Sequence, residues 1–544
     1  MIPFEPNSRA DANARTTNVC IWTLKLSEEA ATDRIAHYLA PLLGAGDMVT
    51  LTGGLGAGKT AFARFLIRAL TQDPQLEVPS PTFTLVQTYD IPHKTLKSSQ
   101  EAYAVPLTIQ HLDLFRLEGP SDLHALDFEE TIDHAITLVE WPERIARILP
   151  PDRLDVMLRL LPGTKKEERL LTLTGYGLWR ERLRRAQDIH RLLHSAGWSQ
   201  AKREHVQGDA SSRAYERLFK PDGQSAILMI SPPRPDGPPI RRGKSYSTIA
   251  KLAENVEAFV ALARGLRQHG LSAPDILYAD LDAGLLLIED FGTQNILVNS
   301  APDAERYLAS IDAIAHLHAK PVTNTLPVTH ERNYVVPPFD MEAMLIEVEL
   351  ILDWYLPHIA GSLISAASRA EFLNMWSQAL ETVVRGEATW VLRDYHSPNI
   401  MWIPERAGVR RVGILDFQDA VMGHPAYDVA SIAQDARVNV SLELELKLLT
   451  RYGALRRSLQ PDFDVSSFAR AYALLGAQRA TKILGIFARL DKRDAKPQYL
   501  KHIPRVEAYL KRNLDHPALS AIKAWYITQI PHLYAPKNTT QPPR

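Results

Sequence analysis

A glycine-rich stretch at residues 53–60, which reads Gly-Gly-Leu-Gly-Ala-Gly-Lys-Thr, places the strongest constraint on the fold of this chain. It follows a short apolar run at 47–52 and precedes apolar residues at helical spacing between 61 and 70. Glycines in such a turn let successive backbone N–H groups point at one anion, and the start of the following helix adds a positive dipole end. The stretch therefore predicts a phosphate-binding loop between a strand and a helix. The residues expected to contact a nucleotide are Gly53, Gly54, Gly56, Ala57, Gly58, Lys59 and Thr60, with Lys59 at the β- and γ-phosphates and Thr60 as a Mg²⁺ ligand.

A second set of polar residues lies more than three hundred positions later. Asp394 and Asn399 are five residues apart, and Asp416 follows seventeen residues further on, at the end of an apolar run. Phosphoryl transfer to a hydroxyl group needs a carboxylate that accepts the proton, and oxygen ligands for Mg²⁺. Asp394 fits the role of the base, while Asn399 and Asp416 fit the metal ligands. Two sites of different design predict two enzymes in one chain.

The length of 544 residues predicts two to four domains, at about 150 residues each. The apolar share of 45% and the charged share of 23% are typical of a soluble globular protein. The only cysteine, Cys20, excludes an internal disulfide and a cysteine-based zinc site. No apolar run approaches the roughly 18 residues that a membrane span needs, and residues 1–20 lack the apolar core of a secretory signal. These features predict a cytoplasmic protein without a membrane partner.

The charge is unevenly distributed along the chain. Residues 1–178 carry 17 Lys and Arg against 23 Asp and Glu, whereas the remainder carries 45 against 40. An acidic front half is a poor binder of nucleic acid by itself, because affinity for nucleic acid depends on neutralising phosphates.

The pattern of strands and helices predicts two domains behind a flexible N-terminal extension at 1–19. Residues 20–178 alternate strand-like and helical segments, which is typical of an α/β phosphate-binding domain. Residues 179–544 are expected to form the second domain, opened by a charged helix at 179–194. A small sheet lobe at about 200–293 and a helical lobe at about 300–520 are expected within it.

The first half resembles the TsaE family over roughly residues 20–175. The motifs that carry this resemblance occur in the family's order, at residues 53–60, 80–84 (Ser-Pro-Thr-Phe-Thr), 111–116 (His-Leu-Asp-Leu-Phe-Arg) and 139–143 (Val-Glu-Trp-Pro-Glu). TsaE is the small P-loop ATPase of the bacterial machinery that makes threonylcarbamoyladenosine at position 37 of tRNAs.

This resemblance implies an ATP- and Mg²⁺-dependent ATPase in which Lys59 and Asp113 take catalytic roles. Thr60 and Glu140 would lie on the metal side. It also implies TsaB- and TsaD-like proteins as partners, with tRNA contacted only indirectly. The segment from Asp90 to Ile109 exceeds the family's usual hairpin length and puts partner docking in question.

The second half resembles the aminoglycoside-phosphotransferase-like kinases, a two-lobed α+β fold, over about residues 185–520. More narrowly, three stretches resemble the AmgK sugar kinases, at residues 208–217, 392–400 and 423–428. Those enzymes phosphorylate the anomeric hydroxyl of N-acetylmuramate and N-acetylglucosamine in cell-wall recycling. The resemblance implies ATP and Mg²⁺ as cofactors and an amino sugar as substrate. It places Gly208, Ser211 and Ser212 over the phosphates and Glu289 in the hinge near adenine. It also places Asp428 beneath the catalytic loop at residues 392–400.

Two alternatives to a sugar kinase stay open at this point. The strand at 226–230 lacks the lysine that many kinases place there, so a nucleotide-binding pseudokinase that regulates the front ATPase is one alternative; Arg213 and Lys244 are the candidates to replace the lysine. A kinase that acts on an aminoglycoside, choline or homoserine is the other.

Some residues that resemble site motifs are assigned no catalytic role. Asp290 begins an Asp-Phe-Gly tripeptide, but it precedes the catalytic loop and is therefore rejected as a metal ligand. His316 and His318 lie two apart on a predicted helix, a spacing that does not suit a zinc site.

Overall fold

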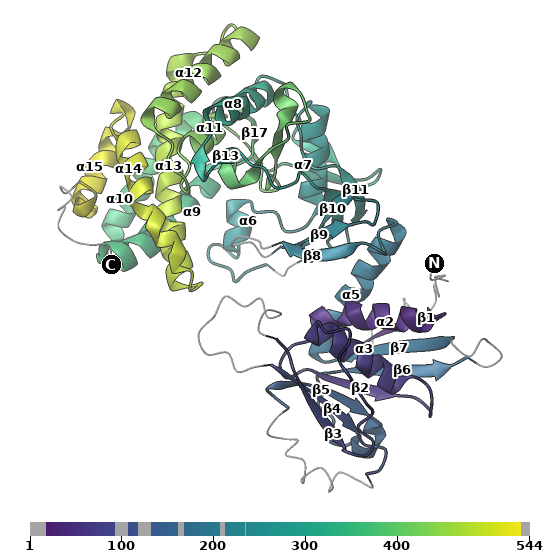
Figure 1. Ribbon diagram of the computed structural model, residues 1–544. Helices are drawn as coiled ribbons and strands as arrows, with labels where there is room; N and C mark the ends of the chain where they lie inside the picture. Colours follow the sequence, from purple (N-terminus) through teal and green to yellow (C-terminus); the bar gives the residue numbers. More distant parts are fainter. Residues whose placement is uncertain are drawn as a thin grey trace. The chain divides into compact units, whose positions relative to one another are not determined.

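The computed structural model describes residues 18–92, 107–117, 132–161, 168–206, 213–233 and 236–534. The chain divides into two compact units, Met1–Gly197 and Trp198–Arg544 (Figure 1). Each unit has its own hydrophobic core and is described by itself.

The first unit is built on a seven-stranded sheet with the order β1-β7-β6-β2-β5-β4-β3. The four central strands β6, β2, β5 and β4 run parallel, whereas β1, β7 and β3 pair antiparallel with their neighbours. Nearly every residue of β2 and β5 is buried, as expected for central parallel strands covered on both faces. The strands are β1 (Val19–Leu26), β2 (Met48–Thr52), β3 (Val86–Asp90), β4 (Thr108–Asp113), β5 (Ala135–Glu140), β6 (Arg153–Leu160) and β7 (Arg169–Tyr176).

Three longer helices lie in the described residues of this unit, namely α2 (Glu29–Leu39), α3 (Lys59–Thr71) and α5 (Leu178–Ser195), with short 3₁₀ turns η1 (Ala40–Leu42) and η4 (Pro142–Ile145). α2 packs against α3, and α5 packs against β1 and β7. Trp179, Leu183 and Ala186 of α5 belong to the core of the first unit. Two side chains of α5, Trp179 and Arg182, also bond to the carboxylate of Asp47 before β2, at 3.0 and 2.7 Å.

The position of α5 differs from the sequence expectation. Although the charge pattern predicts that a helix at 179–194 opens the second domain, its apolar face covers the sheet of the first unit. The boundary between the two compact units along the chain accordingly falls between Gly197 and Trp198. An amphipathic helix shows in its sequence that it needs an apolar partner surface, but not which surface that is.

The second unit begins with a five-stranded antiparallel sheet of order β11-β12-β10-β9-β8. Two helices, α6 (Tyr246–Ala250) and α7 (Glu257–Gln268), lie between the third and fourth of these strands along the chain. The strands are β8 (Lys202–Val206), β9 (Ala214–Phe219), β10 (Ser225–Ile230), β11 (Ile276–Asp280) and β12 (Leu285–Glu289).

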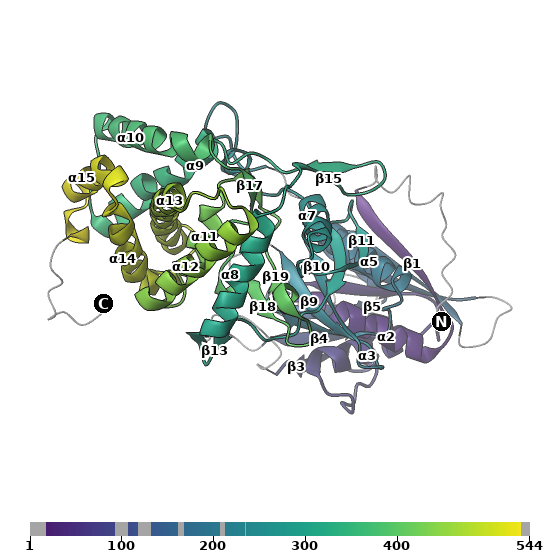
Figure 2. The same ribbon diagram turned by 90° about the horizontal axis from the view of Figure 1, so that it is seen from above.

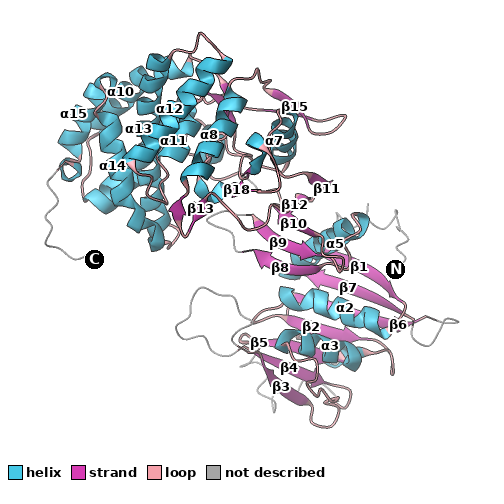
Figure 3. Ribbon diagram, turned by 45° about the horizontal axis from the view of Figure 1, so that its top comes forward, coloured by secondary structure: helices cyan, strands magenta, loops and turns pink. Residues whose placement is uncertain are grey.

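The rest of the second unit is mostly helical (Figures 2 and 3). Its helices are α8 (Ala304–His318), α9 (Met341–Leu350), the π-helical η5 (Ile351–Ala360), α10 (Ala366–Val384), α11 (Ala426–Ala433), α12 (Leu442–Leu459), α13 (Val465–Lys492), α14 (Ile503–Leu514) and α15 (Ser520–Gln529). Short 3₁₀ turns are η6 (Ser397–Asn399), η7 (Gly408–Arg411), η8 (Pro497–His502), η9 (Pro517–Leu519) and η10 (Pro531–Leu533).

Four small antiparallel ribbons are inserted among these helices. They pair β13 (Leu297–Val298) with β14 (Ala301–Pro302), β15 (Thr325–Pro327) with β16 (Asn333–Val335), β17 (Thr389–Val391) with β20 (Val421–Gly423), and β18 (Ile400–Trp402) with β19 (Val412–Ile414). The last two ribbons matter most for function, because β17, β18 and β19 flank the predicted catalytic residues.

The fold class predicted from the sequence is confirmed: a P-loop α/β domain precedes a two-lobed kinase-like domain. Several expected features lie outside the described residues, including 1–17 of the N-terminal extension and 93–106 of the long insertion. The ends of that insertion are described: Ile91 N–H donates to Leu107 O at 2.9 Å, and β3 pairs with β4 there. Among the helices of the described segments, none has both the length and the apolar content that crossing a membrane requires.

Candidate active sites

The glycine-rich loop of the first unit joins β2 to α3, as its sequence predicts. Gly53 has φ 140°, and a Cβ there would lie 2.3 Å from the carbonyl oxygen of Leu158, so only glycine fits. Gly58 has φ 106° and immediately precedes the first residue of α3. The loop therefore presents backbone N–H groups and a helix start, the arrangement that binds phosphate.

Lys59 is folded back onto this loop. Its Nζ donates to the carbonyl oxygens of Gly53 and Gly54 at 2.9 and 3.1 Å, and lies 3.8 Å from the centre of the Trp141 ring. Burial lowers the pKa of the Lys59 ammonium, although the carboxylates of Glu140 and Asp113 act in the opposite direction. The lysine is thus held at the loop by interactions that an anionic group could replace.

The two predicted carboxylates of this half are brought together by strand register. Asp113 ends β4 and Glu140 ends β5, and the two are direct partners in the parallel ladder. Glu140 Oε2 accepts a hydrogen bond from Thr60 Oγ1 at 3.0 Å, which links the carboxylate to the first turn of α3. Asp113 accepts from Thr82 Oγ1 at 2.5 Å and from Ser80 Oγ at 3.4 Å. Carboxylates at the C-terminal ends of parallel strands beside a phosphate loop are suited to a nucleotide site.

Three residues of the first site have no role in the sequence prediction. His111 Nε2 lies 3.0 Å from Glu140 Oε1, and Arg169 Nε donates to Ala57 O at 3.0 Å. Trp141, at φ 59°, is the residue whose ring lies over Lys59. Arg169 starts β7, over a hundred positions after the loop, so no local motif points to it.

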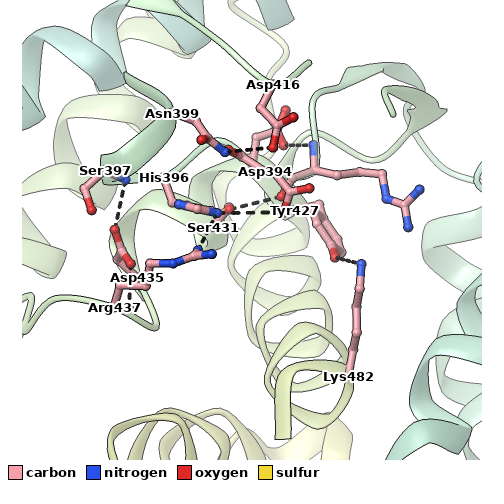
Figure 4. Close-up of polar contacts among 12 residues, drawn as sticks. Asp394, His396, Ser397, Asn399, Asp416, Tyr427, Ser431, Asp435, Arg437 and Lys482 are labelled. Carbon is pink, nitrogen blue, oxygen red and sulfur yellow. Dashed lines mark hydrogen bonds and ion pairs between the residues drawn. The ribbon is translucent and has the colours of Figure 1, made fainter. Parts of the chain in front are cut away.

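The second site is formed where β17 and β19 end, and Figure 4 shows its side chains. Asp394 follows β17, Asn399 precedes β18, and Asp416 follows β19. Asn399 Nδ2 lies 3.0 Å from the carbonyl oxygen of Asp394 and 3.4 Å from Asp416 Oδ2, so the three residues meet in one place. The side chains of Asp394 and Asp416 are 43% and 39% exposed, which leaves both carboxylates accessible.

The backbone of the catalytic loop is held from below by α11. The Asp428 carboxylate, fully buried in the first turn of that helix, accepts the N–H groups of Leu392 and Arg393 at 2.7 and 2.9 Å. Arg393 has φ 66°, and its carbonyl accepts from Ser431 Oγ at 3.1 Å. These bonds fix a strained loop conformation in front of Asp394, as the sequence predicts for Asp428.

The surroundings of Asp394 and Asp416 shift the pKa values of their carboxyl groups in opposite directions. Partial desolvation by the surrounding protein acts to raise the pKa of the Asp394 carboxyl, but the basic groups around it, His396 foremost, hold that pKa below its usual range. Lys482, Arg393 and Arg479 act in the same direction as His396. By contrast, partial desolvation by the surrounding protein and the neighbouring Asp394 carboxylate raise the pKa of Asp416. Burial also lowers the pKa of His396 to about 4.

The remaining predicted residues of this half are more scattered. Glu289 forms an ion pair with Arg406, and its N–H donates to Asp275 O at 2.9 Å. Asp290 pairs with Arg217 at 2.9 Å. Of the two candidates to replace the kinase lysine, Arg213 NH1 lies 3.5 Å from Asp416 Oδ1, whereas Lys244 pairs with Glu342 at 3.3 Å. Gly208, Ser211 and Ser212 lie outside the described residues.

Metal-ligating clusters of three or more His, Cys, Asp or Glu residues do not occur in the described part of the chain. His318 is buried against Tyr452, at 2.9 Å from its hydroxyl, and His316 Nε2 lies 3.1 Å from the carbonyl oxygen of His269.

A buried group of charges behind the catalytic loop is absent from the sequence prediction. Glu347 on α9 pairs with Arg393 and, at 2.7 Å, with Lys482 on α13. Arg479, one turn before Lys482, is also buried. These residues come from helices about 50 and 90 positions away from the loop, and their local sequence resembles ordinary helix.

Comparisons with known proteins agree with the division of the chain into two units. The family model described as "Threonylcarbamoyl adenosine biosynthesis protein TsaE" matches residues 26–169, and that described as "Phosphotransferase enzyme family" matches residues 202–461. The chain is 38% identical over 143 residues to the tRNA threonylcarbamoyladenosine biosynthesis protein TsaE of Rickettsia felis, which covers 26% of this chain and 75% of that protein.

The second half is similar to two sugar kinases. The chain is 38% identical over 352 residues to the N-acetylmuramate/N-acetylglucosamine kinase of Caulobacter vibrioides, covering 62% of this chain and 95% of that protein. It is 29% identical over 329 residues to the protein of the same name from Pseudomonas aeruginosa, covering 59% and 87%. Each group of relatives matches the half of the chain that holds the corresponding site. The chain belongs to the TsaE family through its first half and to the family of N-acetylmuramate/N-acetylglucosamine kinase-like phosphotransferases through its second.

Proposed function

We propose that the second unit transfers the γ-phosphate of ATP to the anomeric hydroxyl of N-acetylmuramate and N-acetylglucosamine. The observation that carries this proposal is the meeting of Asp394, Asn399 and Asp416 at the ends of two short ribbons. The activity in the names of the two kinases, which this chain matches over most of their length, supports the choice of acceptor.

In this proposal Asp394 accepts the proton of the sugar hydroxyl as the oxygen attacks the phosphorus atom. A carboxyl group whose pKa lies below its usual range is ionised at neutral pH and ready to accept that proton. The bonds from Leu392 and Arg393 to Asp428 keep the loop, and therefore the base, in position before the substrate arrives.

The side chains of Asn399 and Asp416 would hold Mg²⁺. Amide and carboxylate oxygens are the ligands this ion prefers, and the two side chains already lie within 3.4 Å of each other. Bound there, the ion would supply positive charge to the transferred phosphoryl group. Gly208, Ser211 and Ser212 would cover the ATP phosphates, and the segment at Glu289 would adjoin adenine.

We infer that the first unit hydrolyses ATP in the synthesis of threonylcarbamoyladenosine on tRNA. The loop residues Gly53, Gly54, Gly56, Ala57 and Gly58 would bind the phosphates with Lys59. Thr60 and Glu140 would lie on the Mg²⁺ side, since their side chains are 3.0 Å apart, and Asp113 would act as the catalytic carboxylate. TsaB- and TsaD-like proteins would be the partners, and tRNA would be contacted through them. Because both proposed reactions consume ATP, the proposal includes a cytoplasmic location.

Phosphate transfer by the full-length protein tests the kinase proposal. The protein is incubated with ATP, Mg²⁺ and each sugar, and phosphorus NMR identifies a phosphate on the anomeric oxygen. Asp394→Asn is expected to lower kcat by at least about 10²-fold, because general-base catalysis contributes roughly that much. Asp462→Asn, at an exposed position far along the chain, is the matched control. ATP binding without transfer to either sugar by the unsubstituted protein would support the pseudokinase alternative instead.

ATP hydrolysis in the presence of TsaB- and TsaD-like proteins tests the proposal for the first unit. Lys59→Met is expected to abolish stimulated hydrolysis, while Lys25→Met, which removes an exposed lysine of β1, leaves it intact. Hydrolysis that persists in Lys59→Met and disappears in Asp394→Asn would assign ATP hydrolysis to the second unit and contradict the proposal.

A further inference from the structure

Arg479 of α13 is a buried cation that has no direct partner among the described residues. The residue is only 6% exposed. Within the described part of the chain, its guanidinium group makes no hydrogen bond and no ion pair at the distances that define them. Burying an unpaired charge is unfavourable, and folded proteins normally pair such a group with an anion or place it where a ligand supplies one.

The neighbouring acidic residue is already occupied. Glu347 pairs with Arg393 and with Lys482, so this single carboxylate faces two cations. Lys482 lies three positions after Arg479 and therefore on the same side of α13. The cluster of Arg393, Lys482 and Arg479 thus carries more positive charge than Glu347 neutralises.

Arg479 acts on the groups around the proposed base. Its charge contributes to the low pKa of Asp394, the proposed base, and acts on the adjoining His396 and Tyr427. On the phosphate side, Arg213 reaches Asp416 at 3.5 Å. Arg213 and Arg479 therefore act on different carboxylates of the site.

The two proposed acceptors differ by a group that an arginine recognises. N-acetylmuramate carries a lactyl ether ending in a carboxylate, and N-acetylglucosamine has a hydroxyl at that position. A guanidinium group can bind a carboxylate through two parallel hydrogen bonds. We propose that Arg479 binds the lactyl carboxylate of N-acetylmuramate and so sets the preference of this kinase for the acidic sugar. This proposal rests on the proposed sugar-kinase function.

The test compares kcat/KM for N-acetylmuramate, its methyl ester and N-acetylglucosamine. In Arg479→Met the ratio of kcat/KM for N-acetylmuramate to that for N-acetylglucosamine is expected to fall by about 10- to 100-fold, the range for a lost hydrogen bond to a charged group. Arg479→Lys keeps the charge but not the planar pair of donors and should fall in between. Arg470→Met, an exposed arginine on the same helix, is the matched control and should keep the original ratio.

The methyl ester gives a second measurement that needs no variant. The unsubstituted protein should use the ester less well than the acid by a similar factor, and Arg479→Met should not distinguish them. An equal loss with all three acceptors in Arg479→Met would assign the arginine to the phosphate or to folding, and would overturn the proposal. So would an unsubstituted protein that uses ester and acid equally.

Failure of the underlying function gives a different result. If the unsubstituted protein transfers phosphate to neither sugar, the sugar-kinase function and the role of Arg479 are both wrong. If it uses both sugars and Arg479→Met leaves their ratio unchanged, only the role of Arg479 is wrong. The melting temperature of Arg479→Met should stay close to that of the unsubstituted protein, because the substitution removes an unpaired buried charge.

Discussion

At the scale of single residues, the second unit depends on charges that are buried together behind its catalytic loop. Glu347 is completely buried and lies between Arg393, which is 2% exposed, and Lys482, which is 12% exposed. The Arg393 side chain also donates to Ala250 O at 2.9 Å. Because Arg393 precedes Asp394, this cluster anchors the proposed base to α9 and α13.

Replacing Glu347 with Gln should destabilise the second unit by about 3–5 kcal/mol, since two buried cations would lose their counter-charge. Glu349→Gln, two positions away on α9, is the matched control. Its partners Arg241 and Arg369 are 36% and 35% exposed and can be hydrated again, so we expect a loss of about 1 kcal/mol or less. Urea unfolding measures both variants. Equal losses would show that the Glu347 cluster adds nothing beyond an ordinary partly exposed ion pair.

The stability of the protein should fall in mild acid because of histidines that are buried in the neutral form. Burial lowers the pKa of His424 to about 4, and its Nδ1 accepts the N–H of Ala426 at 3.2 Å. The unfolded chain takes up this proton below pH 6.5, whereas the folded chain does so only near pH 4. The free energy of unfolding therefore decreases as the pH falls from 6.5 to 4, by about 1.4 kcal/mol per pH unit for one such group.

His424→Asn should reduce this acid loss, because Asn can accept the same N–H but does not titrate. Urea unfolding between pH 4 and 8 should give a shallower slope below pH 6.5 in the variant, and parallel curves above it. The slope should not vanish, since burial also lowers the pKa of His396 to about 4. Identical slopes in the two proteins would contradict the assignment to His424.

The residues that sequence alone could identify are those inside contiguous motifs. Gly53, Lys59 and Thr60 follow one another between β2 and α3, and Asp394 and Asn399 share one short loop, so their spacing carries the information. Arg479 offered no such signal. It lies 85 positions after Asp394 on a long helix, and only the packing of α13 brings it to the site.

At the scale of elements, α13 is the helix on which the second unit is assembled. Its 28 residues contact α9, α11, α14 and η5. At Gly485 the contact is so close that a Cβ would lie 2.4 Å from the backbone carbon of Leu350, at the end of α9. The absence of a side chain at this position is therefore a condition of the packing.

Gly485→Ala should destabilise the second unit by about 1–3 kcal/mol, even though alanine favours helix, because the added methyl group pushes α13 away from Leu350. Gly453→Ala in the middle of α12 is the matched control: the nearest atom to its Cβ, Val465 Cγ2, would be 3.9 Å away. That variant should gain about 0.5–1 kcal/mol. Thermal unfolding distinguishes them, and a stabilised Gly485→Ala would show that the close contact can relax.

Elements were predictable where the sequence repeats one period over a whole segment. The strand β2 and the helix α3 were expected close to where they occur, from the apolar run at 47–52 and the helical spacing between 61 and 70. The partner of α5 was not, because an apolar face on a charged helix is compatible with either neighbouring sheet. The side chain of Trp179 is 1% exposed and belongs to the core of the first unit, which shows that α5 covers the sheet of that unit.

At the scale of the whole molecule, the packing of α5 sets where the chain can be divided. A fragment of residues 1–197 should fold and unfold cooperatively, because it keeps α5 on β1 and β7. A fragment of residues 1–178 loses Trp179 and the rest of that helix, and should show no cooperative thermal transition by circular dichroism. Trp179→Ala in the longer fragment tests whether the packing of α5 is the cause, and it should lower the free energy of unfolding by about 3–5 kcal/mol. A well-folded 1–178 fragment would show that α5 is dispensable.

The short segment after α5 has a consequence for the ratio in which the two units occur in the cell. Only residues 196–201 separate the last turn of α5 from β8, and both of these elements are folded into their own units. A protease that needs an extended, accessible segment finds few residues between the two units. Synthesis of one chain supplies the two units in a one-to-one ratio, and we expect degradation to remove them together. A cell that needs the two activities in different proportions must therefore adjust them on the finished protein, through substrates, partners or inhibitors, because transcription and turnover cannot separate them.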